Sequence, residues 1–402
     1  MITRHRSPLL AAAAAACLLL TACSGGGATE KKPAHPVFDA PVQQQPRQAL
    51  LTTQNAGSAS FTQTLTFTSR HGDTVLTSRG RLDFPGSRAS ASSVWKLADG
   101  LPGSTKDALL GTTLDNNSSP TTMRVAVDAS TIRIRPGRAD YWLRYDESDP
   151  WTTGSIDSLR GSEAAFGGTL LEIVSGARDV KQSATGGGDR RYRAQVTAYN
   201  ALALFAPDIR GELHSSISPT STENPVELEI TADSRGRITR AAADLSPLLG
   251  KEGSTLHPMK RLRAVLTLNG FGASEPTAGA PAGTTLVARK AVLPIADVPR
   301  GACVDSNTGI RDTDESMVVR VACEQPHDAR VLAHPGLGGG DYPGDESAER
   351  RADSACERAY DSAPSSWTRE AADSGTYWLA WPSESEWGVG EDPKATCYVV
   401  SR

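Results

Sequence analysis

The sequence has few aromatic residues and no cysteine over most of its length, and both absences restrict the structures it can form. Phe, Trp and Tyr make up 5% of its 402 residues, so a core must be built mainly from aliphatic side chains. No cysteine lies between residues 24 and 302, so this region must be stable by packing alone. After the first 20 residues no apolar stretch approaches the roughly 20 residues of a membrane-spanning helix. Lysines and arginines form no run either, so the sequence favours neither a nucleic-acid partner nor a polybasic membrane contact.

The first 23 residues have the three parts of a secretory signal. Arg4 and Arg6 make the start positive, residues 9–20 are almost uninterruptedly apolar, and small residues follow. The segment 20–23, Leu-Thr-Ala-Cys, resembles the lipobox of bacterial lipoproteins. The resemblance implies removal of residues 1–22 and a diacylglyceryl group on the sulfur of Cys23. An ordinary signal peptide with a coincidental cysteine is the alternative.

A lipidated Cys23 would hold the protein at the extracytoplasmic face of the cell membrane, which is the expected partner. Two acyl chains give stable attachment, whereas one gives only marginal binding. The segment after Cys23 is rich in Gly, Pro, Lys and Gln, so residues 23–46 are expected to form a flexible stalk of about 25–30 Å. Loss of Arg4 and Arg6 with the signal changes the formal charge from -4 to -6.

The other four cysteines that remain after removal of the signal lie in the last quarter of the chain and are expected to form two disulfides. They are Cys303, Cys323, Cys356 and Cys397. An even number of cysteines in an exported segment indicates disulfides, and four cysteines allow three pairings. We favour Cys303–Cys323 with Cys356–Cys397, partly because each cysteine borders a separate apolar run. The polar segment 273–285 is expected to be a hinge between a domain at 47–272 and a disulfide-bonded domain at 286–402.

Alternation of apolar and polar residues dominates the region 47–272 and predicts antiparallel strands. Phe61, Leu65 and Phe67 share one face of a strand whose other face carries threonines, and a turn at 70–73 leads to a returning strand. Further strands are expected at 123–127, 132–134, 141–145, 192–196, 226–230 and 262–268, with helices near 49–51 and at 164–174 and 199–213. The pattern predicts an α+β fold with a curved antiparallel sheet whose apolar face is backed by helices.

The order of these elements resembles the LppX/LprG-type lipoproteins of actinobacteria, distant relatives of LolA. The resemblance rests on the strand at 61–66, the charged hairpin at 227–238 and the closing segment 266–272, Leu-Thr-Leu-Asn-Gly-Phe-Gly. In that family a half-open antiparallel barrel holds lipid acyl chains on its apolar concave face, so the resemblance implies a half-barrel and a lipid ligand. A sheet whose apolar face is filled by its own helices is the alternative.

The last hundred residues resemble the septum formation domain of actinobacterial envelope proteins. The shared pattern is a cysteine, a valine-rich strand, Cys-x-x-Pro-His-Asp at 323–328, Tyr-Pro-Gly at 342–344, a third cysteine, a Pro…Trp-Gly segment and a last cysteine. The resemblance implies a small disulfide-bonded extracytoplasmic module, in which a helix is expected at 347–360. Four tryptophans, at 367, 378, 381 and 387, either fill its core or form a stacking platform for a glycan or an envelope protein.

No pattern in the sequence indicates catalysis. The spacing Cys323-x-x-x-His327 invites a zinc site, but structural zinc requires four reduced ligands at close paired spacings, and an exported domain is oxidised. The acidic loop at 305–315 lacks the glycine and glutamate of a calcium-binding loop, and the glycine-rich segment 336–340 lacks the Lys-Ser/Thr of a phosphate loop. Hydrolase signatures are absent as well. The sequence therefore predicts a non-enzymatic protein with no metal and no cofactor.

Two functional hypotheses follow. The first is a membrane-anchored binding protein of the cell envelope whose sheet holds a lipid or another apolar ligand. The second is an envelope or cell-division scaffold that acts through residues 286–402 and binds no small ligand.

Overall fold

The structure is a computed structural model. It describes residues 35–86, 88–110, 121–128, 131–137, 139–146, 169–186, 188–205, 207–213, 224–251, 253–273, 283–306, 317–369, 371, 376–387 and 392–401. The predicted signal segment, Cys23 and the first part of the predicted stalk lie outside these residues.

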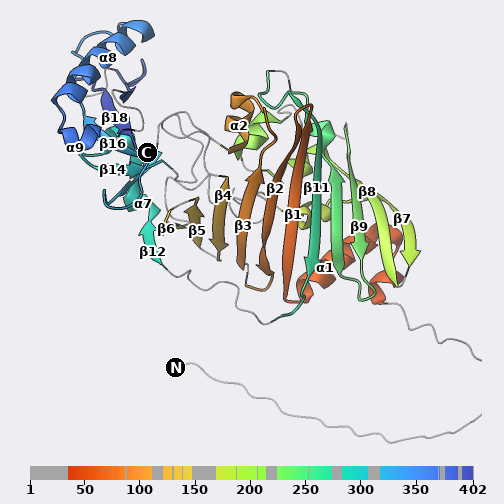
Figure 1. Cartoon of the computed structure of the whole chain (residues 1–402). Helices are drawn as coiled ribbons and strands as arrows, with labels where there is room; N and C mark the ends of the chain where they lie inside the picture. Colours follow the sequence, from red (N-terminus) through yellow and green to blue (C-terminus); the bar gives the residue numbers. More distant parts are fainter. Residues whose placement is uncertain are drawn as a thin grey trace, which may run out of the picture. The chain divides into compact units, whose positions relative to one another are not determined.

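A large sheet contains twelve of the described strands (Figure 1). The strand order is β12-β6-β5-β4-β3-β2-β1-β11-β10-β9-β8-β7, and neighbours are antiparallel except for β12 and β6. The sheet is curved and not closed. Its strands are β1 (Ser58–Ser69), β2 (Gly72–Asp83), β3 (Arg88–Lys96), β4 (Thr122–Val127), β5 (Thr131–Pro136), β6 (Tyr141–Asp146), β7 (Arg178–Gly186), β8 (Asp189–Val196), β9 (Val226–Ala232), β10 (Ile238–Asp244), β11 (Met259–Asn269) and β12 (Thr284–Val287).

The alternation read from the sequence decides which face of each strand is buried. In β1 every second residue is buried through all twelve positions, and Phe61, Leu65 and Phe67 are at most 3% exposed. The predicted hairpin is confirmed, because β1 and β2 pair along their full length up to Ser69 opposite Gly72. Gly72 has a φ of 108°, which favours glycine at this tight turn.

Short helices accompany the large sheet. They are η1 (Pro36–Asp39), η2 (Val42–Gln44), α1 (Gln45–Asn55), α2 (Gly103–Leu110), α4 (Leu170–Val174), α5 (Ala198–Leu202), α6 (Pro207–Glu212) and η4 (Ser246–Leu248). Helix α1 packs against β9 and β10, and α4 packs against β10 and β11. The single helix predicted at 199–213 is wrong: the chain forms α5 and then α6. Pro207 is the first residue of α6, and a proline starts a helix well but interrupts its interior.

The stalk predicted at 23–46 extends too far into the chain, since residues 35–46 belong to the packed fold. Val37 is only 6% exposed, and a Cβ added to Gly236 would lie 2.8 Å from its side chain. The amide of Gln43 donates to the carbonyl of Val180 and accepts from its N–H, both at 2.9 Å. Gln43 therefore satisfies backbone groups of the edge strand β7, which would otherwise be open to another chain.

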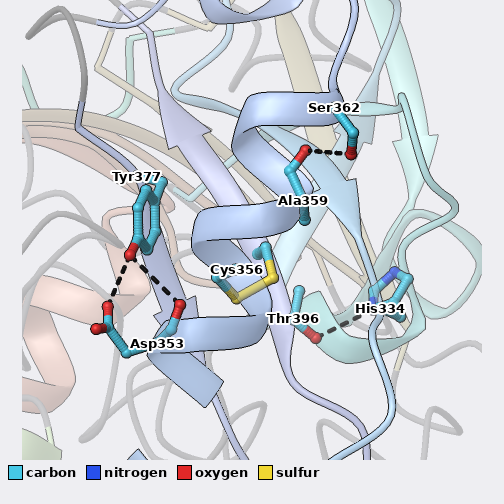
Figure 2. Close-up of a disulfide and its surroundings, with 8 residues drawn as sticks. His334, Asp353, Cys356, Ala359, Ser362, Tyr377 and Thr396 are labelled. Atoms are coloured by element: carbon cyan, nitrogen blue, oxygen red, sulfur yellow. Dashed lines mark hydrogen bonds between the residues drawn. A yellow bond between two sulfur atoms is a disulfide. The ribbon is translucent and has the colours of Figure 1, made fainter. Parts of the chain in front are cut away.

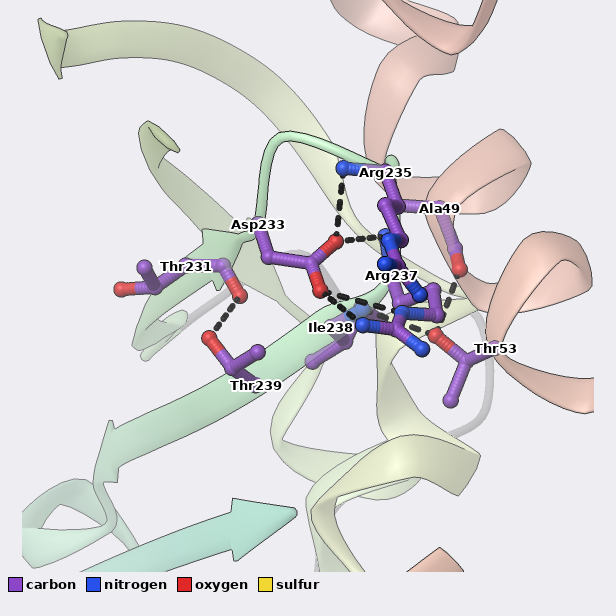
Figure 3. A network of polar contacts seen from close by, with 8 residues as sticks. All are labelled: Ala49, Thr53, Thr231, Asp233, Arg235, Arg237, Ile238 and Thr239. Atoms are coloured by element: carbon purple, nitrogen blue, oxygen red, sulfur yellow. Dashed lines mark hydrogen bonds and ion pairs between the residues drawn. The ribbon is translucent and has the colours of Figure 1, made fainter. Parts of the chain in front are cut away.

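Hydrogen bonds join α1 to the turn between β9 and β10 (Figure 3). The hydroxyl of Thr53 accepts from the N–H of Ile238 at 2.8 Å and donates to a carbonyl one turn earlier in α1 at 2.7 Å. Asp233 closes the turn by accepting from the N–H groups of Arg235 and Arg237 at 3.0 and 2.9 Å. Its carboxylate also pairs with the guanidinium of Arg237 at 2.6 Å.

The C-terminal part forms a second sheet with helices beside it. Its order among the described strands is β13-β15-β14-β16-β18-β17, all antiparallel. The elements are α7 (Ala288–Ala291), β13 (Val292–Pro294), η5 (Ile295–Asp297), β14 (Cys303–Asp305), β15 (Met317–Val321), β16 (Ala329–Ala333), α8 (Asp345–Ser362), α9 (Ser365–Thr368), β17 (Trp378–Ala380) and β18 (Thr396–Val400). The helix predicted at 347–360 lies within α8, so the α+β class is confirmed for both parts.

The boundary predicted between residues 285 and 286 falls inside β12. This strand pairs with β6 of the large sheet, with Leu286 opposite Leu143. Val292 and Met317, which belong to the second sheet, are buried in the same apolar core as the large sheet. Residues 35–402 group into one unit by their contacts, and the division of this unit into two domains at 47–272 and 286–402 stays a prediction.

Within the described residues, no helix combines the length and the hydropathy that crossing a bilayer requires.

Candidate functional site

The inner face of the large sheet is the face on which α1 and α4 pack, and it is the surface that the sequence predicted to bind an apolar ligand. Residues directly opposite each other on neighbouring strands form rows across this face. One row runs through Leu143, Ile134, Val125, Ala91, Gly80, Phe61 and Leu268, from β6 to β11. Its six side chains are at most 7% exposed. This row of the inner face is therefore apolar across seven of the described strands.

Two neighbouring strands of the inner face carry four small residues, which we call the small-residue patch. It consists of Ser78 and Gly80 on β2 and of Ala91 and Ser93 on β3. Ser78 lies opposite Ser93 with their hydroxyl oxygens 2.9 Å apart, and Gly80 lies opposite Ala91. Larger side chains flank the patch, with Phe61 on β1 and Val125 on β4. Whatever packs on the sheet can approach its backbone more closely here than on either side.

One polar side chain stands among the apolar residues of β1. Gln63 faces inward and is 2% exposed, and its carbonyl oxygen accepts from the N–H of Leu170 at 2.9 Å. Leu170 is the first residue of α4, whose start is also held by a capping box between Thr169 and Glu172. Gln63 thus fixes the start of α4 over the sheet. This role was not predicted from the sequence, although a polar residue at an inward position of an alternating strand was the available signal.

Two buried tyrosines add hydroxyl groups to the inner face without adding charge. Tyr192 on β8 donates to the side-chain oxygen of Gln45 at 2.7 Å, and burial raises the pKa of Tyr192 to about 12. Burial also raises the pKa of Tyr145 on β6 far above its ordinary value. Both hydroxyls stay protonated at neutral pH, which suits a face that contacts apolar groups.

The cysteines of the C-terminal part form two disulfides in the pairing favoured from the sequence. Cys303 is bonded to Cys323 with an S–S distance of 2.06 Å, and Cys356 to Cys397 with 1.98 Å. The second disulfide joins α8 to β18 (Figure 2). All four sulfurs are in covalent bonds, so these cysteines offer no thiolates to a zinc ion.

Two histidines of this part have structural partners. His327 Nδ1 lies 2.9 Å from the carbonyl oxygen of Gln325, so this side chain closes the turn before β16. His334 Nε2 lies 2.7 Å from the carbonyl oxygen of Val298. Its Nδ1 lies 3.2 Å from the hydroxyl of Thr396 (Figure 2). Neither geometry prepares a general base for catalysis.

The last residue of the Cys-x-x-Pro-His-Asp motif, Asp328, lies beside the carboxyl group of Asp305 on β14. Asp328 accepts from the N–H and the hydroxyl of Ser306 at 2.9 and 2.7 Å. Burial and the nearby carboxyl group of Asp305 raise the pKa of Asp328 above its ordinary value. The hydroxyl of Tyr141 on β6 donates to Asp305 at 2.6 Å. The motif therefore contributes to the contact between the second sheet and the large one.

The four C-terminal tryptophans do not share one role. Trp387 is 2% exposed and meets the ring of Tyr342 edge-on at 5.4 Å, so it fills the core. Trp367 is partly exposed and lies under the guanidinium groups of Arg300 and Arg330, at 5.9 and 5.6 Å. Trp378 and Trp381 are partly buried at the edges of apolar clusters. A common stacking platform stays a prediction.

Two sequence predictions fall wholly or largely on residues that the structure does not describe. The lipid attachment site Cys23 lies outside the described residues, and so does most of the acidic loop at 305–315. Among the described residues, no group of three or more His, Cys, Asp or Glu side chains is placed to hold a metal ion.

The chain has only weak similarity to known proteins. No protein-family model matches it, and no curated protein matches it. Among solved structures it is similar to the Mycobacterium tuberculosis lipoprotein LppX, with 14% identity, a TM-score of 0.30 and coverage of 58% of this chain and 95% of that one. It is also similar to LprF from Mycobacterium bovis, with 12% identity, a TM-score of 0.32 and coverage of 59% and 96%. A putative outer membrane lipoprotein-sorting protein domain from Vibrio parahaemolyticus follows, with 7% identity, a TM-score of 0.20 and coverage of 57% and 95%. These values establish no family for the chain.

Proposed function

We propose that this protein is anchored to the extracytoplasmic face of the cell membrane through a diacylglyceryl group on Cys23 and binds a lipid or another apolar ligand on the inner face of its large sheet. The observation that carries the ligand proposal is the small-residue patch beside a buried row of apolar side chains. The lipobox-like segment at 20–23 supports the anchor.

The patch has the chemistry that an acyl chain requires. Burying a CH₂ group contributes about 0.8 kcal/mol, so about ten buried groups contribute about 8 kcal/mol, the free energy of a micromolar complex. Apolar binding sites also carry a few polar groups that orient the ligand. Here Ser78 and Ser93 lie opposite each other on β2 and β3 and would supply hydroxyl contacts to a ligand carbonyl.

Filling the patch tests the ligand. Ala91→Phe places a large ring on the inner face of β3, and Val94→Phe, at a position 45% exposed on the other face of that strand, is the matched control. Native mass spectrometry of the mature chain should find lipid on the wild type and the control and much less on Ala91→Phe, with similar melting temperatures for all three. The proposal is refuted if the wild type carries no ligand and Ala91→Phe lowers the free energy of unfolding by about 1–3 kcal/mol, because the protein itself then fills the space over the patch.

The anchor is tested separately. Cys23→Ala removes the sulfur that would carry the diacylglyceryl group, so the precursor should accumulate uncut and leave the detergent phase on Triton X-114 partition. Normal maturation and detergent partition of the Cys23→Ala protein would show that the lipobox interpretation is wrong.

A further inference from the structure

The outer face of the large sheet gathers arginines on its β2–β6 half, and we call this group the arginine face. It consists of Arg79 on β2, Arg124 on β4, Arg133 and Arg135 on β5, and Arg144 on β6. These strands lie side by side (Figure 1), and the five residues alternate with buried residues of the inner face. The chain as a whole has a net charge of -4, so the concentration of positive charge here is local.

The strand register places like charges directly opposite each other twice. Arg124 on β4 is opposite Arg135 on β5, and Arg133 on β5 is opposite Arg144 on β6. Like charges at directly opposite positions destabilise a sheet. Two such pairs on three adjacent strands therefore weaken the fold unless an anion compensates them.

Only part of this charge is neutralised within the described residues. Arg133 pairs with Asp128 and Arg144 with Asp146, both at 2.9 Å. Arg79 and Arg124 are exposed and have no ion-pair partner among the residues that the structure describes. The Nε of Arg135 donates to a backbone carbonyl, which leaves its charge uncompensated. Within the described residues, three cations on β2, β4 and β5 thus remain available to an external anion.

The positive charge continues across the sheet as one row. Each residue of this row lies directly opposite the next one on the neighbouring strand. The row begins with Arg135 on β5 and Arg124 on β4 and passes through Ser92 on β3 to Arg79 on β2. It then continues through threonines on β1, β11 and β9 and includes Arg240 on β10 and Arg191 on β8. No carboxylate stands in this row. With strands about 4.8 Å apart, its eight steps span about 38 Å.

We propose that the arginine face docks onto the anionic phospholipid head groups of the membrane that carries the anchor, an inference that rests on the proposed function. Guanidinium groups bind phosphate oxygens in a two-pronged geometry, and the patch extends over two dimensions, as a membrane surface does. Val94 on β3, 45% exposed on the same face, is an apolar neighbour suited to the head-group region. Eleven residues separate Cys23 from His35, and a chain of that length reaches at most about 40 Å, so the anchor would keep the fold near the head groups.

Vesicle binding without the anchor tests this docking. The mature chain with Cys23→Ser is mixed with vesicles of phosphatidylcholine alone or with 30 mol% phosphatidylglycerol, at two salt concentrations, and sedimented. Each arginine near an anionic surface contributes about a fivefold increase in partition, so Arg124→Gln/Arg135→Gln should lower partition onto the anionic vesicles about 25-fold. Binding of the Cys23→Ser chain should weaken with salt and be absent on phosphatidylcholine alone.

A charge-matched control separates docking from net charge. Arg350→Gln/Arg351→Gln removes two exposed arginines from α8 and should leave partition unchanged. The Arg124→Gln/Arg135→Gln variant should melt no lower than the Cys23→Ser chain, because it removes an opposed pair. Equal partition of both double variants would overturn the proposal, and so would binding to soluble polyphosphate without binding to vesicles. If native mass spectrometry finds no ligand on the inner face, only the ligand proposal is refuted. The vesicle experiment measures how much protein sediments with the vesicles, and this amount does not depend on a bound ligand.

Discussion

Thr53→Val is the most direct test of how α1 is held on the large sheet. Thr53 is 0% exposed, and its hydroxyl accepts from the N–H of Ile238, a residue that is also 0% exposed. Valine keeps the shape of threonine but has no hydroxyl, so packing is retained and the N–H loses its acceptor. A buried donor left without a partner costs about 1–3 kcal/mol. The carbonyl of Ala49, which receives the donated bond, still accepts within the helix. We therefore expect Thr53→Val to lower the free energy of unfolding by about 2 kcal/mol.

The neighbouring threonine is the control. Thr52 also donates to a carbonyl four residues earlier, at 2.9 Å, but this bond is solvent-exposed, the side chain is only half-buried, and it accepts no hydrogen bond from the described strands. Thr52→Val should change stability by less than about 0.5 kcal/mol. With an unfolding entropy of about 2.1 cal/mol/K per residue over residues 35–402, each kcal/mol shifts the melting temperature by about 1.3 °C, so Thr53→Val should lower it by about 2–3 °C, measured by circular dichroism. Equal shifts for the two variants would show that the bond between α1 and β10 contributes nothing, and would refute the reasoning.

Two further predictions concern the second sheet. Replacing Cys356 and Cys397 together by alanine removes a disulfide across a sequence separation of 41, for which chain entropy predicts a loss of about 4 kcal/mol in thermal unfolding; unchanged stability would contradict the entropic argument. The folded protein raises the pKa of Asp328, so its protonated form adds stability that is complete below about pH 4 and is lost as pH rises through the raised pKa. The free energy of unfolding of Asp328→Asn, measured by denaturant titration, should therefore rise relative to that of the wild type from about pH 4 toward pH 7. If the unfolding free energies of the two proteins change with pH in parallel, this prediction is contradicted.

Local periodicity made much of the large sheet predictable. In β1 and β11 apolar residues alternate with Thr, Arg or Lys, and the alternation places each apolar residue inward. Strand β3 was missed because its segment Ala-Ser-Ala-Ser-Ser contains small residues that differ little in hydropathy. Its inward residues, Ala91 and Ser93, nevertheless form half of the small-residue patch. The residues that define the candidate site were therefore the ones with the weakest sequence signal.

Contacts between residues far apart in the sequence determine whether the segment before β1 is packed, and composition alone did not predict them. The sequence described residues 23–46 as a stalk because they are rich in Pro, Gly and Gln. Gln43 instead pairs with Val180, 137 positions away, and Gln45 receives a hydrogen bond from Tyr192, 147 positions away. Composition reports how flexible a segment is by itself, whereas burial depends on partners that only the folded chain brings near.

The sequence by itself determined the features that depend on neighbouring residues: the alternating strands, the lipobox-like segment that predicts the anchor, and the even set of cysteines that predicted disulfides. It contained no basic run and carried a net negative charge, so it argued against a basic membrane contact. Arg79, Arg124 and Arg135 are separated by tens of residues or by a turn, and only the pairing of β2 with β3, β3 with β4 and β4 with β5 places them in one row. Strand register is set by packing over the whole sheet, and a shift of one residue would turn these arginines inward. Which charges become neighbours was therefore decided by the tertiary structure alone.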